Sequence, residues 1–312
     1  MSVGANRAVP VALGRPRALR LALAYLELTK PRIVMLVVMT GVPALLLAAQ
    51  GMPRPGLFVG TLLGTMFASM SAAAFNHYVD RDIDGLMLRT RTRPLPSGTL
   101  PASHALALGF GLMVLSWSVL LVAANALAAL LAMISIFYYA VVYSVWLKRR
   151  TPQNIVIGGG AGASAPLIAW VAVTGGLALP AWLLAGIVFL WTPPHFWSLA
   201  LYRREDYLRA GIPMLPVTHG EPETRRQILL YACVLVPVTL SLTVLGVSGP
   251  IYGIGAAALG ALFLASTLRL RRSGAVPDAV RTFRFSILYL FLLYVLMTVD
   301  AAVRFLGRPV GG

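Results

Sequence analysis

The stretch PLPSGTLPASHALALGFGLMVLSWSVLLVAANALAALLAMISIFYYAVVYSVWL, residues 94–147, contains no Asp, Glu, Lys or Arg. A helix that crosses a bilayer needs about 20 predominantly apolar residues. The stretch is therefore long enough for two membrane spans. Asn125, which follows two alanines near its middle, marks the turn between them.

Five further stretches of the chain carry no charged side chain. Two of them are long enough for two spans each, with turn residues at 174–180 and 246–250. The other three supply one span each, and the last of these extends through Asp300 to about Phe305. Together with the first stretch they predict an all-α polytopic membrane protein with nine transmembrane helices. The five stretches are 33–53, 55–79, 151–202, 227–268 and 285–299.

The composition of the 312 residues excludes an ordinary water-soluble protein. Hydrophobic residues make up 58% of the chain and charged residues only 12%, about half the share that soluble domains carry. The sequence lacks the alternation of polar and apolar residues that would indicate a β-barrel. The net charge of +16 would suggest nucleic acid in a soluble protein, but the apolar content indicates a membrane, and we expect no nucleic-acid partner. The single cysteine, Cys233, excludes a disulfide framework and a cysteine-based zinc site.

The basic residues predict how the chain is oriented. With the N-terminus in the cytoplasm, 23 of the 26 Lys and Arg residues lie on the cytoplasmic side, as the positive-inside rule requires. We therefore expect a cytoplasmic segment 1–32, a single nine-helix domain over 33–306 and a short external tail 307–312. The abundance of Arg, Ala and Leu suggests a bacterial genome, so the expected location is the bacterial cytoplasmic (inner) membrane. We expect neither a cleaved signal peptide nor a transit peptide.

The acidic residues cluster in a way that topology does not explain. Seven of the ten lie in two cytoplasmic segments, after the second and the sixth predicted spans. In the first segment Asn76, Asp80 and Asp84 recur at i, i+4 and i+8, so a helix that continues out of the membrane carries them on one face. Three oxygen donors on one face suit Mg²⁺. The alternative is that the carboxylates end the helix in water and pair with neighbouring arginines.

A row of arginines follows the first acidic cluster. Arg89, Arg91 and Arg93 stand at two-residue spacing, and guanidinium groups bind phosphate oxygens with two hydrogen bonds each. Carboxylates for a divalent cation beside such a row favour a metal-bridged diphosphate at the membrane surface. The chain has no glycine-rich phosphate loop of the Walker type.

The second cluster follows an unusual span. The sequence WTPPHFW, residues 191–197, places Pro193 and Pro194 inside an apolar stretch, where they are expected to kink or unwind a helix. His195 beside them is a candidate iron ligand, proton carrier or hydrogen-bond donor, or else a histidine that a freed carbonyl satisfies. The small residues of 158–164 allow either close helix packing or a flat ligand, and packing is the more frequent explanation.

Taken together, the motifs resemble the protoheme IX farnesyltransferase family, a branch of the intramembrane aromatic prenyltransferase superfamily. The resemblance extends over nearly the whole chain. It begins at LTKPR (28–32), before the first span, and continues to the last one. The motif of Asn76, Asp80 and Asp84 alone indicates a polyprenyl-diphosphate transferase, and three further segments together are similar to the haem-modifying branch. These segments are RT with RPL (89–90 and 93–95), TPPHFW (192–197) and YRREDY (202–207).

The resemblance implies a fold and an activity. The nine helices would surround a central cavity, with the diphosphate at its cytoplasmic end. Farnesyl diphosphate would donate its chain to a vinyl group of haem B, with addition of water, giving haem O and diphosphate. Mg²⁺ would be the cofactor, and the neighbours would be the lipid bilayer and a haem A synthase or terminal oxidase assembly.

Two alternatives stay open. A prenyltransferase that acts on another aromatic acceptor, such as a quinone precursor, would show the same diphosphate motif. A secondary transporter would also have broken helices and internal repeats, but it needs ionisable residues near the bilayer midplane. No charged residue lies in the middle of a predicted span apart from Asp300, which is near the outer end of the last one.

The resemblance also implies roles for individual residues, with two departures. His77 stands where relatives with other acceptors often have Asp. Glu205 and Asp206 are adjacent, whereas the superfamily has two aspartates one turn apart. Of these two residues, only Asp206 is expected to bind metal. The expected metal ligands are Asn76, Asp80, Asp84 and Asp206, and the expected diphosphate-binding residues are Asn76, Lys30, Arg32, Arg89 and Arg93. The expected catalytic residues are Asp80, Asp84, Arg93 and His195.

An allylic cation needs electron-rich surroundings until the acceptor attacks it, and aromatic faces supply them. The candidate aromatic residues are Tyr78, Phe137, Tyr138, Tyr139 and Tyr143.

Overall fold

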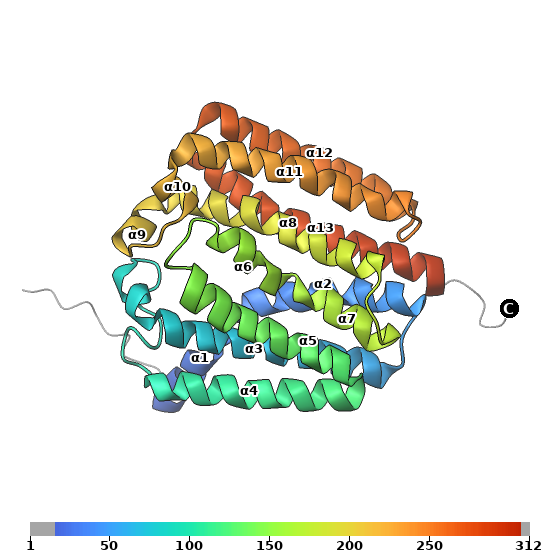
Figure 1. Ribbon diagram of the computed structural model, residues 1–312, viewed down its shortest axis with the longest axis horizontal. Helices are drawn as coiled ribbons and strands as arrows, with labels where there is room; N and C mark the ends of the chain where they lie inside the picture. The colour runs from blue at the N-terminus through green and yellow to red at the C-terminus, as the bar shows by residue number, and fades with distance from the viewer. Residues whose placement is uncertain (1–15, 307–312) are drawn as a thin grey trace, which may run out of the picture.

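The computed structural model describes residues 16–306, and this part of the chain is helical without a strand (Figure 1). Nine of its helical segments are long and apolar enough to cross a membrane, which confirms the predicted fold class. The predictions for residues 1–15 and 307–312 lie outside the described residues. The helices are α1 (Arg17–Leu28), α2 (Pro31–Ala49), α3 (Pro55–Leu86), α4 (Ala102–Ala123), α5 (Ala126–Phe137), the π-helix η1 (Tyr138–Leu147), α6 (Asn154–Gly162), α7 (Ser164–Thr174), α8 (Leu179–Tyr202), α9 (Arg204–Arg209), α10 (Leu215–Thr218), α11 (Gly220–Val244), α12 (Pro250–Ser273) and α13 (Val276–Leu306).

Two of the spans consist of two helical pieces each. The fourth combines α5 and η1, and the fifth combines α6 and α7. The tight connections lie where the sequence predicts them. Asn125 caps α5 because its side chain accepts a hydrogen bond from the backbone N–H of Ala128 at 2.9 Å. Gly175 and Gly246 have positive φ angles of 73° and 72° at the ends of α7 and α11, as glycine allows at a helix C-terminus.

The helix α8 lies at the centre of the packing. It contacts α11, α13, α6 and α7, while α2 contacts α7, α13 and α3. The largest apolar cluster joins side chains of α2, α7, α8, α11, α12 and α13. This cluster fixes α8 and α13 against each other, and both helices carry residues of the sites described below.

The helix α1 has no counterpart among the predicted elements. It packs through Ala24 and Leu28 against Leu100 and Ala105, and the hydroxyl of Tyr25 lies 2.6 Å from Nδ1 of His104. The segment before the first span is therefore partly a helix that is docked on the bundle.

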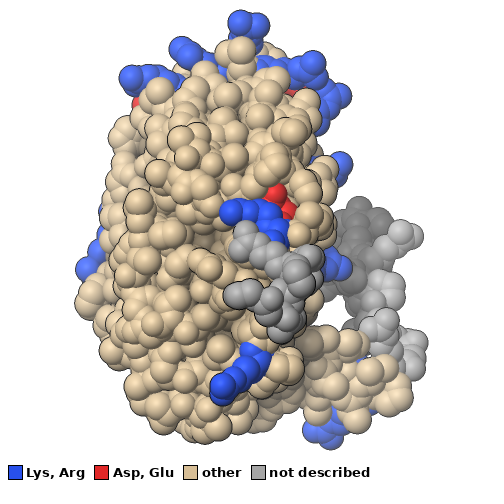
Figure 2. All heavy atoms as spheres, turned by 90° about the vertical axis from the view of Figure 1, so that its right-hand side faces the viewer, with Lys and Arg blue, Asp and Glu red and all other residues tan. Residues whose placement is uncertain are grey.

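The two ends of the bundle differ in charge. The left end in Figure 1 carries α9, α10 and the connections 87–101 and 148–153, where basic residues gather. Figure 2 views the opposite end, whose described surface is largely uncharged. The connections at that end contain a single basic residue, Arg54. The structure thus reproduces the predicted asymmetry, and the assignment of the basic end to the cytoplasm stays a prediction.

Candidate functional site

The motif on α3 divides into an inner and an outer face. The helix continues without a break to Leu86, so Asn76, Asp80 and Asp84 share one face, and their exposed fractions are 3%, 1% and 1%. Asp82 points the other way and forms two hydrogen bonds of 2.7 Å with Arg149. The predicted common face is confirmed. The alternative, in which a carboxylate pairs with an arginine at the surface, applies to Asp82, whose side chain is 60% exposed.

Asn76 connects the inner face of α3 to two other segments. Its Nδ2 donates to Asp80 Oδ2 at 2.8 Å and to Ser144 Oγ at 2.9 Å. Its Oδ1 accepts a hydrogen bond of 2.6 Å from Lys30 Nζ. The amide is thereby held between an acid and a base, and its orientation is fixed by both.

Three cations surround the two carboxylates. Arg93 donates to Asp84 Oδ2 at 2.7 Å, Lys148 forms an ion pair with Asp80 Oδ2, and Lys30 reaches Asn76. The structure thus brings together five of the residues predicted to lie at the diphosphate and metal site, namely Asn76, Asp80, Asp84, Lys30 and Arg93. Lys148 is the residue that the sequence reasoning missed, because it was counted only among the topology-setting charges. A signal was present: the chain has 24 arginines but only two lysines, Lys30 and Lys148, and both lie here.

The π-helix η1 places Lys148 and Ser144. The backbone N–H of Lys148 donates to the carbonyl of Tyr143 at 2.9 Å, and Ser144 Oγ donates to the carbonyl of Tyr139 at 2.8 Å. Segments of π-helix are frequent at functional sites. Here the wider turn brings a hydroxyl and an ammonium group against Asn76 and Asp80 of α3.

Lys30 adopts a backbone conformation that side chains rarely take. Its φ and ψ angles of 50° and 57° lie in the left-handed region, immediately before Pro31. For a residue other than glycine this conformation costs on the order of 1–3 kcal/mol and persists only where the surroundings impose it. Burial, and after it the charge of the nearby Arg93, lower the pKa of Lys30 to about 7. A strained, half-buried lysine that lies near carboxylates is poised to take up a further anion.

The carboxylates have free oxygens. Oδ1 of Asp80 and Oδ1 of Asp84 are buried and have no hydrogen-bond partner among the described residues. Buried polar atoms are rarely left without a partner, so these two atoms suit a bound cation. No group of three or more His, Cys, Asp or Glu side chains within residues 16–306 is arranged to hold a metal by itself. The donor set therefore fits Mg²⁺ that is shared with phosphate oxygens, which is its usual mode of binding.

The remaining predicted ligands lie apart from this pair. Asp206 is buried and accepts hydrogen bonds from Arg209 at 2.8 Å and from the backbone N–H of Leu88 at 3.4 Å. This contact joins α9 to the connection after α3, so the two acidic segments do meet. Arg89 is exposed beside Tyr207; burial raises the pKa of the Tyr207 hydroxyl, and the Arg89 guanidinium opposes that shift. Arg32 is exposed, and none of its contacts within the described part of the chain ties it to the carboxylates.

Two of the five candidate aromatic residues lie next to the carboxylates. The rings of Tyr139 and Tyr143 stack with centroids 5.4 Å apart. Both hydroxyls are close enough to Asp80 to interact with its charge. Gly158 of α6 has no room for a side chain because the ring of Tyr143 occupies it. Gly158 thus serves close packing, the explanation that the sequence favours for this segment. The other three candidates lie elsewhere: Phe137 is exposed, Tyr138 donates to the carbonyl of Ile157, and Tyr78 stacks under Arg81.

His195 lies at the junction of α8 and α13. The helix α8 is continuous through Pro193 and Pro194, so the double proline does not unwind it. The ring of His195 stacks between Trp191 and Phe283, with centroid distances of 4.3 and 4.7 Å. No freed carbonyl satisfies this histidine among the described residues. Its Nδ1 lies 2.8 Å from a side-chain hydroxyl of α13.

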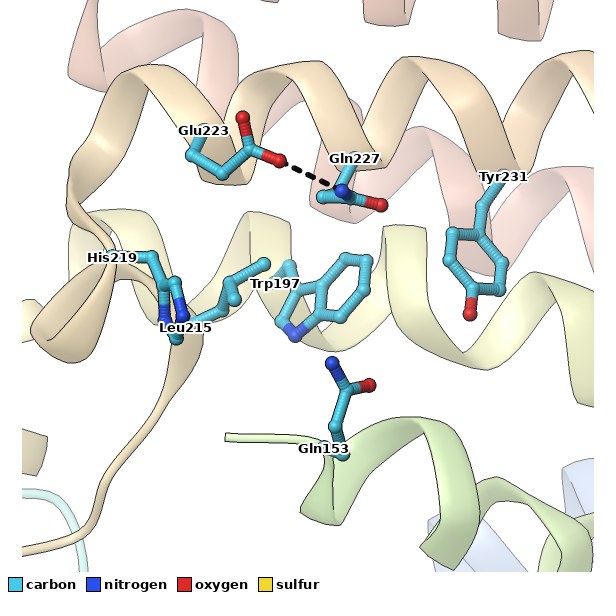
Figure 3. A pocket seen from close by; sticks show the side chains of 7 residues that line it. All are labelled: Gln153, Trp197, Leu215, His219, Glu223, Gln227 and Tyr231. Carbon is cyan, nitrogen blue, oxygen red and sulfur yellow. Dashed lines mark hydrogen bonds between the residues drawn. The ribbon is translucent and has the colours of Figure 1, made fainter. Parts of the chain in front are cut away.

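A separate pocket of about 210 Å³ lies at the same end of the bundle (Figure 3). The indole of Trp197 points across it toward Gln153, and on the opposite wall Gln227 donates to Glu223 at 2.7 Å. None of the predicted site residues lines this pocket. Its seven residues are Gln153, Trp197, Leu215, His219, Glu223, Gln227 and Tyr231.

Within residues 16–306, nine spans and a basic end that encloses two carboxylates define a polytopic membrane protein with a candidate site for a metal-bound polyanion. A model of the UbiA prenyltransferase family matches residues 35–296. The chain belongs to this family.

Curated relatives share one name. The chain is 50% identical over 282 residues to the protoheme IX farnesyltransferase of Gloeobacter violaceus, covering 90% of this chain and 92% of the relative. It is 47% identical over 290 residues to the protein of that name from Roseiflexus sp. (strain RS-1), covering 93% of this chain. The match covers 54% of the Roseiflexus protein, so this chain spans about half the length of that relative.

Solved structures share the fold. A digeranylgeranylglyceryl phosphate synthase superposes with a TM-score of 0.75 at 20% identity, covering 90% of this chain and 98% of that one. A UbiA homologue from Archaeoglobus fulgidus, bound to GPP and Mg²⁺, superposes with a TM-score of 0.58 at 18% identity, covering 88% and 99%.

Proposed function

We propose that this protein transfers the farnesyl group of farnesyl diphosphate to a vinyl group of haem B, with addition of water, and releases haem O and diphosphate. The observation that carries the proposal is the pair of buried carboxylates on α3, each with one unpartnered oxygen, among three cationic side chains. Such a site suits a metal-bridged diphosphate. The shared name of the curated relatives supports protoheme as the acceptor.

Asn76, Asp80 and Asp84 are the residues that would hold Mg²⁺. The ion supplies Lewis-acid neutralisation of the charge that develops on the departing diphosphate. The relative from Archaeoglobus fulgidus that binds GPP and Mg²⁺ supports this assignment. Asp206, tied to Arg209 and to the connection after α3, is the proposed carboxylate of a second metal position.

Lys30, Lys148 and Arg93 are the proposed diphosphate-binding cations. Without substrate, each is bonded to a side chain of α3. Phosphate oxygens accept the same charge-assisted hydrogen bonds, so the cations exchange one partner for another without a long movement. Preorganised cations of this kind stabilise a leaving group more strongly than water does. Arg32 and Arg89, at the exposed rim of the same end, are proposed to bind the outer phosphate.

The bond changes balance. The allylic C–O bond of farnesyl diphosphate breaks and the electron pair leaves with the diphosphate. The terminal carbon of a haem vinyl group attacks the farnesyl cation, and water adds to the neighbouring carbon and loses a proton. The stacked rings of Tyr139 and Tyr143 stabilise the allylic cation by cation–π contact and exclude water from it. His195 is the side chain that we propose to lie at the haem B acceptor.

The proposed setting is the bacterial cytoplasmic membrane, in which the nine spans lie. Because the proposed product is a haem O molecule that remains in the bilayer, a haem A synthase or a terminal oxidase assembly is the expected neighbour.

The test is an assay of the purified protein in lipid nanodiscs with farnesyl diphosphate, haem B and Mg²⁺. We expect a haem that carries a hydroxyethylfarnesyl group, detected by mass spectrometry. If haem B returns unchanged while a quinone precursor such as 4-hydroxybenzoate becomes prenylated, the acceptor is wrong and the family activity stands. If no acceptor is prenylated, the assignment of the site on α3 to a prenyl diphosphate is wrong.

A further inference from the structure

Ser286 of α13 controls the surroundings of His195. Its side chain is fully buried, and its Oγ lies 2.8 Å from His195 Nδ1. The same hydroxyl donates a hydrogen bond of 2.7 Å to the backbone carbonyl of Phe283, one turn earlier on α13. One oxygen atom therefore takes part in two hydrogen bonds.

The count of protons decides the direction of the bond to His195. A serine hydroxyl has a single proton, and here that proton is donated to the carbonyl of Phe283, which can only accept. The contact between His195 and Ser286 then needs its proton from the imidazole. His195 is thereby held as the tautomer with hydrogen on Nδ1, and its Nε2 carries the free lone pair.

The orientation of the ring is fixed as well. Trp191 and Phe283 cover its two faces, at interplanar angles of 17° and 25°. The indole N–H of Trp191 donates to the backbone carbonyl of the same Ser286 at 2.7 Å. Ser286 thus binds Trp191 through its backbone and His195 through its side chain, and the imidazole can rotate neither out of its plane nor within it.

One edge of the ring remains for a ligand. No described residue hydrogen-bonds Nε2 of His195, and this atom is not among the fully buried polar atoms that lack a partner. The surroundings are aromatic, and no carboxylate of the described residues contacts the ring, so a neutral imidazole is the form that burial favours. A neutral, oriented imidazole nitrogen is a common ligand of haem iron.

We propose that Ser286 is a positioning residue that holds His195 in the Nδ1–H tautomer, so that Nε2 binds the iron of the porphyrin acceptor. Histidine ligands of metals regularly donate their other ring N–H to a second group, which fixes the tautomer and raises the basicity of the ligand. The tautomer follows from the hydrogen bonds alone, whereas the iron as partner rests on the proposed function.

The first experiment titrates the purified protein in nanodiscs with ferric protoheme IX and records the visible spectrum. We expect a nitrogen-ligated spectrum that His195→Ala abolishes, and Ser286→Ala to weaken binding by about 10- to 100-fold. Ser286→Thr retains a hydroxyl and should restore the wild-type spectrum. Thr298→Val is the matched control, because Thr298 on the same helix also donates to a backbone carbonyl, Tyr294 O at 2.8 Å, and has no histidine partner.

Ser286→Ala keeps the backbone carbonyl that Trp191 uses, so the packing of α8 on α13 is expected to survive. A thermal unfolding temperature of Ser286→Ala within a few degrees of that of Thr298→Val verifies this. An unchanged spectrum and affinity in Ser286→Ala would overturn the positioning role of Ser286. A nitrogen-ligated spectrum in His195→Ala would overturn the assignment of His195 as the iron ligand.

The second experiment measures the tautomer without haem or turnover. The protein is labelled with ¹⁵N-histidine, and the signals of His195 are identified by their loss in His195→Ala. We expect a protonated Nδ1 and an unprotonated Nε2 in the wild type, and a mixture of tautomers in Ser286→Ala. A protonated Nε2 in the wild type contradicts the proposal even if haem O is made. The expected tautomer and spectrum without any farnesylated haem leave the proposal standing and contradict the proposed function.

Discussion

At the scale of single residues, the motif on α3 contains its own control. Asp80 and Asp84 face the interior and Asp82 faces Arg149 at the surface, although all three lie within one and a half turns. We expect Asp80→Asn and Asp84→Asn each to lower turnover by about 100-fold or more, because an amide cannot replace the anionic ligand of the metal site. Asp82→Asn should keep at least half of the wild-type rate. Equal losses in all three variants would contradict the assignment of the inner face.

Metal removal tests the same carboxylates. With EDTA we expect turnover to fall to background and to return on addition of Mg²⁺, because the two unpartnered oxygens of Asp80 and Asp84 have no internal donor to replace the ion. Isothermal titration with Mg²⁺ and a non-hydrolysable farnesyl diphosphate analogue should show joint binding in the wild type. Joint binding of the same strength in Asp84→Asn would contradict this site.

Lys148 gives a second prediction at this scale. Its ammonium is the partner of Asp80, and we propose that it moves to the diphosphate. Lys148→Gln should raise KM for farnesyl diphosphate by about 10-fold, as loss of a charge-assisted hydrogen bond does, with a smaller effect on KM for haem B. Arg150→Gln is the control, since Arg150 is exposed two residues further on. A larger effect on KM for haem B than for farnesyl diphosphate would contradict the role.

At the scale of helices, close packing of α6 on η1 holds the site together. A side chain on Gly158 would overlap the ring of Tyr143, whereas one on Gly162 of the same helix meets open space. Gly158→Ala should therefore destabilise the protein by about 1–3 kcal/mol through overpacking and reduce turnover, because Tyr143 and Lys148 belong to one segment. Gly162→Ala should do neither. Thermal unfolding in detergent and the farnesyl transfer assay measure both effects, and equal stability of the two variants would contradict the packing argument.

The helices also show which features can be predicted from sequence. Runs without charge gave the nine spans, and the turns at Asn125, Gly175 and Gly246 were visible because each has a local chemical cause. The π-helix was not visible in the sequence, since it depends on the contacts of Lys148 and Ser144 with α3 rather than on the propensities of its own residues. The hydroxyl of Ser286 beside His195 is likewise a contact between distant helices, which no local pattern encodes.

At the scale of the whole molecule, the charge difference between the two ends predicts the orientation. The connection that contains Thr99 lies at the basic end, and the connection that contains Ala178 lies at the other. Because basic loops stay in the cytoplasm, the acidic pair on α3 and the three cations beside it should open toward the compartment in which soluble prenyl diphosphates occur. The uncharged end should face outward.

Cysteine labelling measures this orientation, since the chain has a single cysteine, Cys233. In a Cys233→Ala background, we expect Ala178→Cys to react with a membrane-impermeant maleimide in intact spheroplasts. Thr99→Cys should react only after the membrane is opened. Both positions are exposed in the structure, so a lack of reaction reflects the barrier of the membrane rather than burial. Reaction of Thr99→Cys in intact spheroplasts would reverse the orientation, and the diphosphate site would then face away from its proposed substrate.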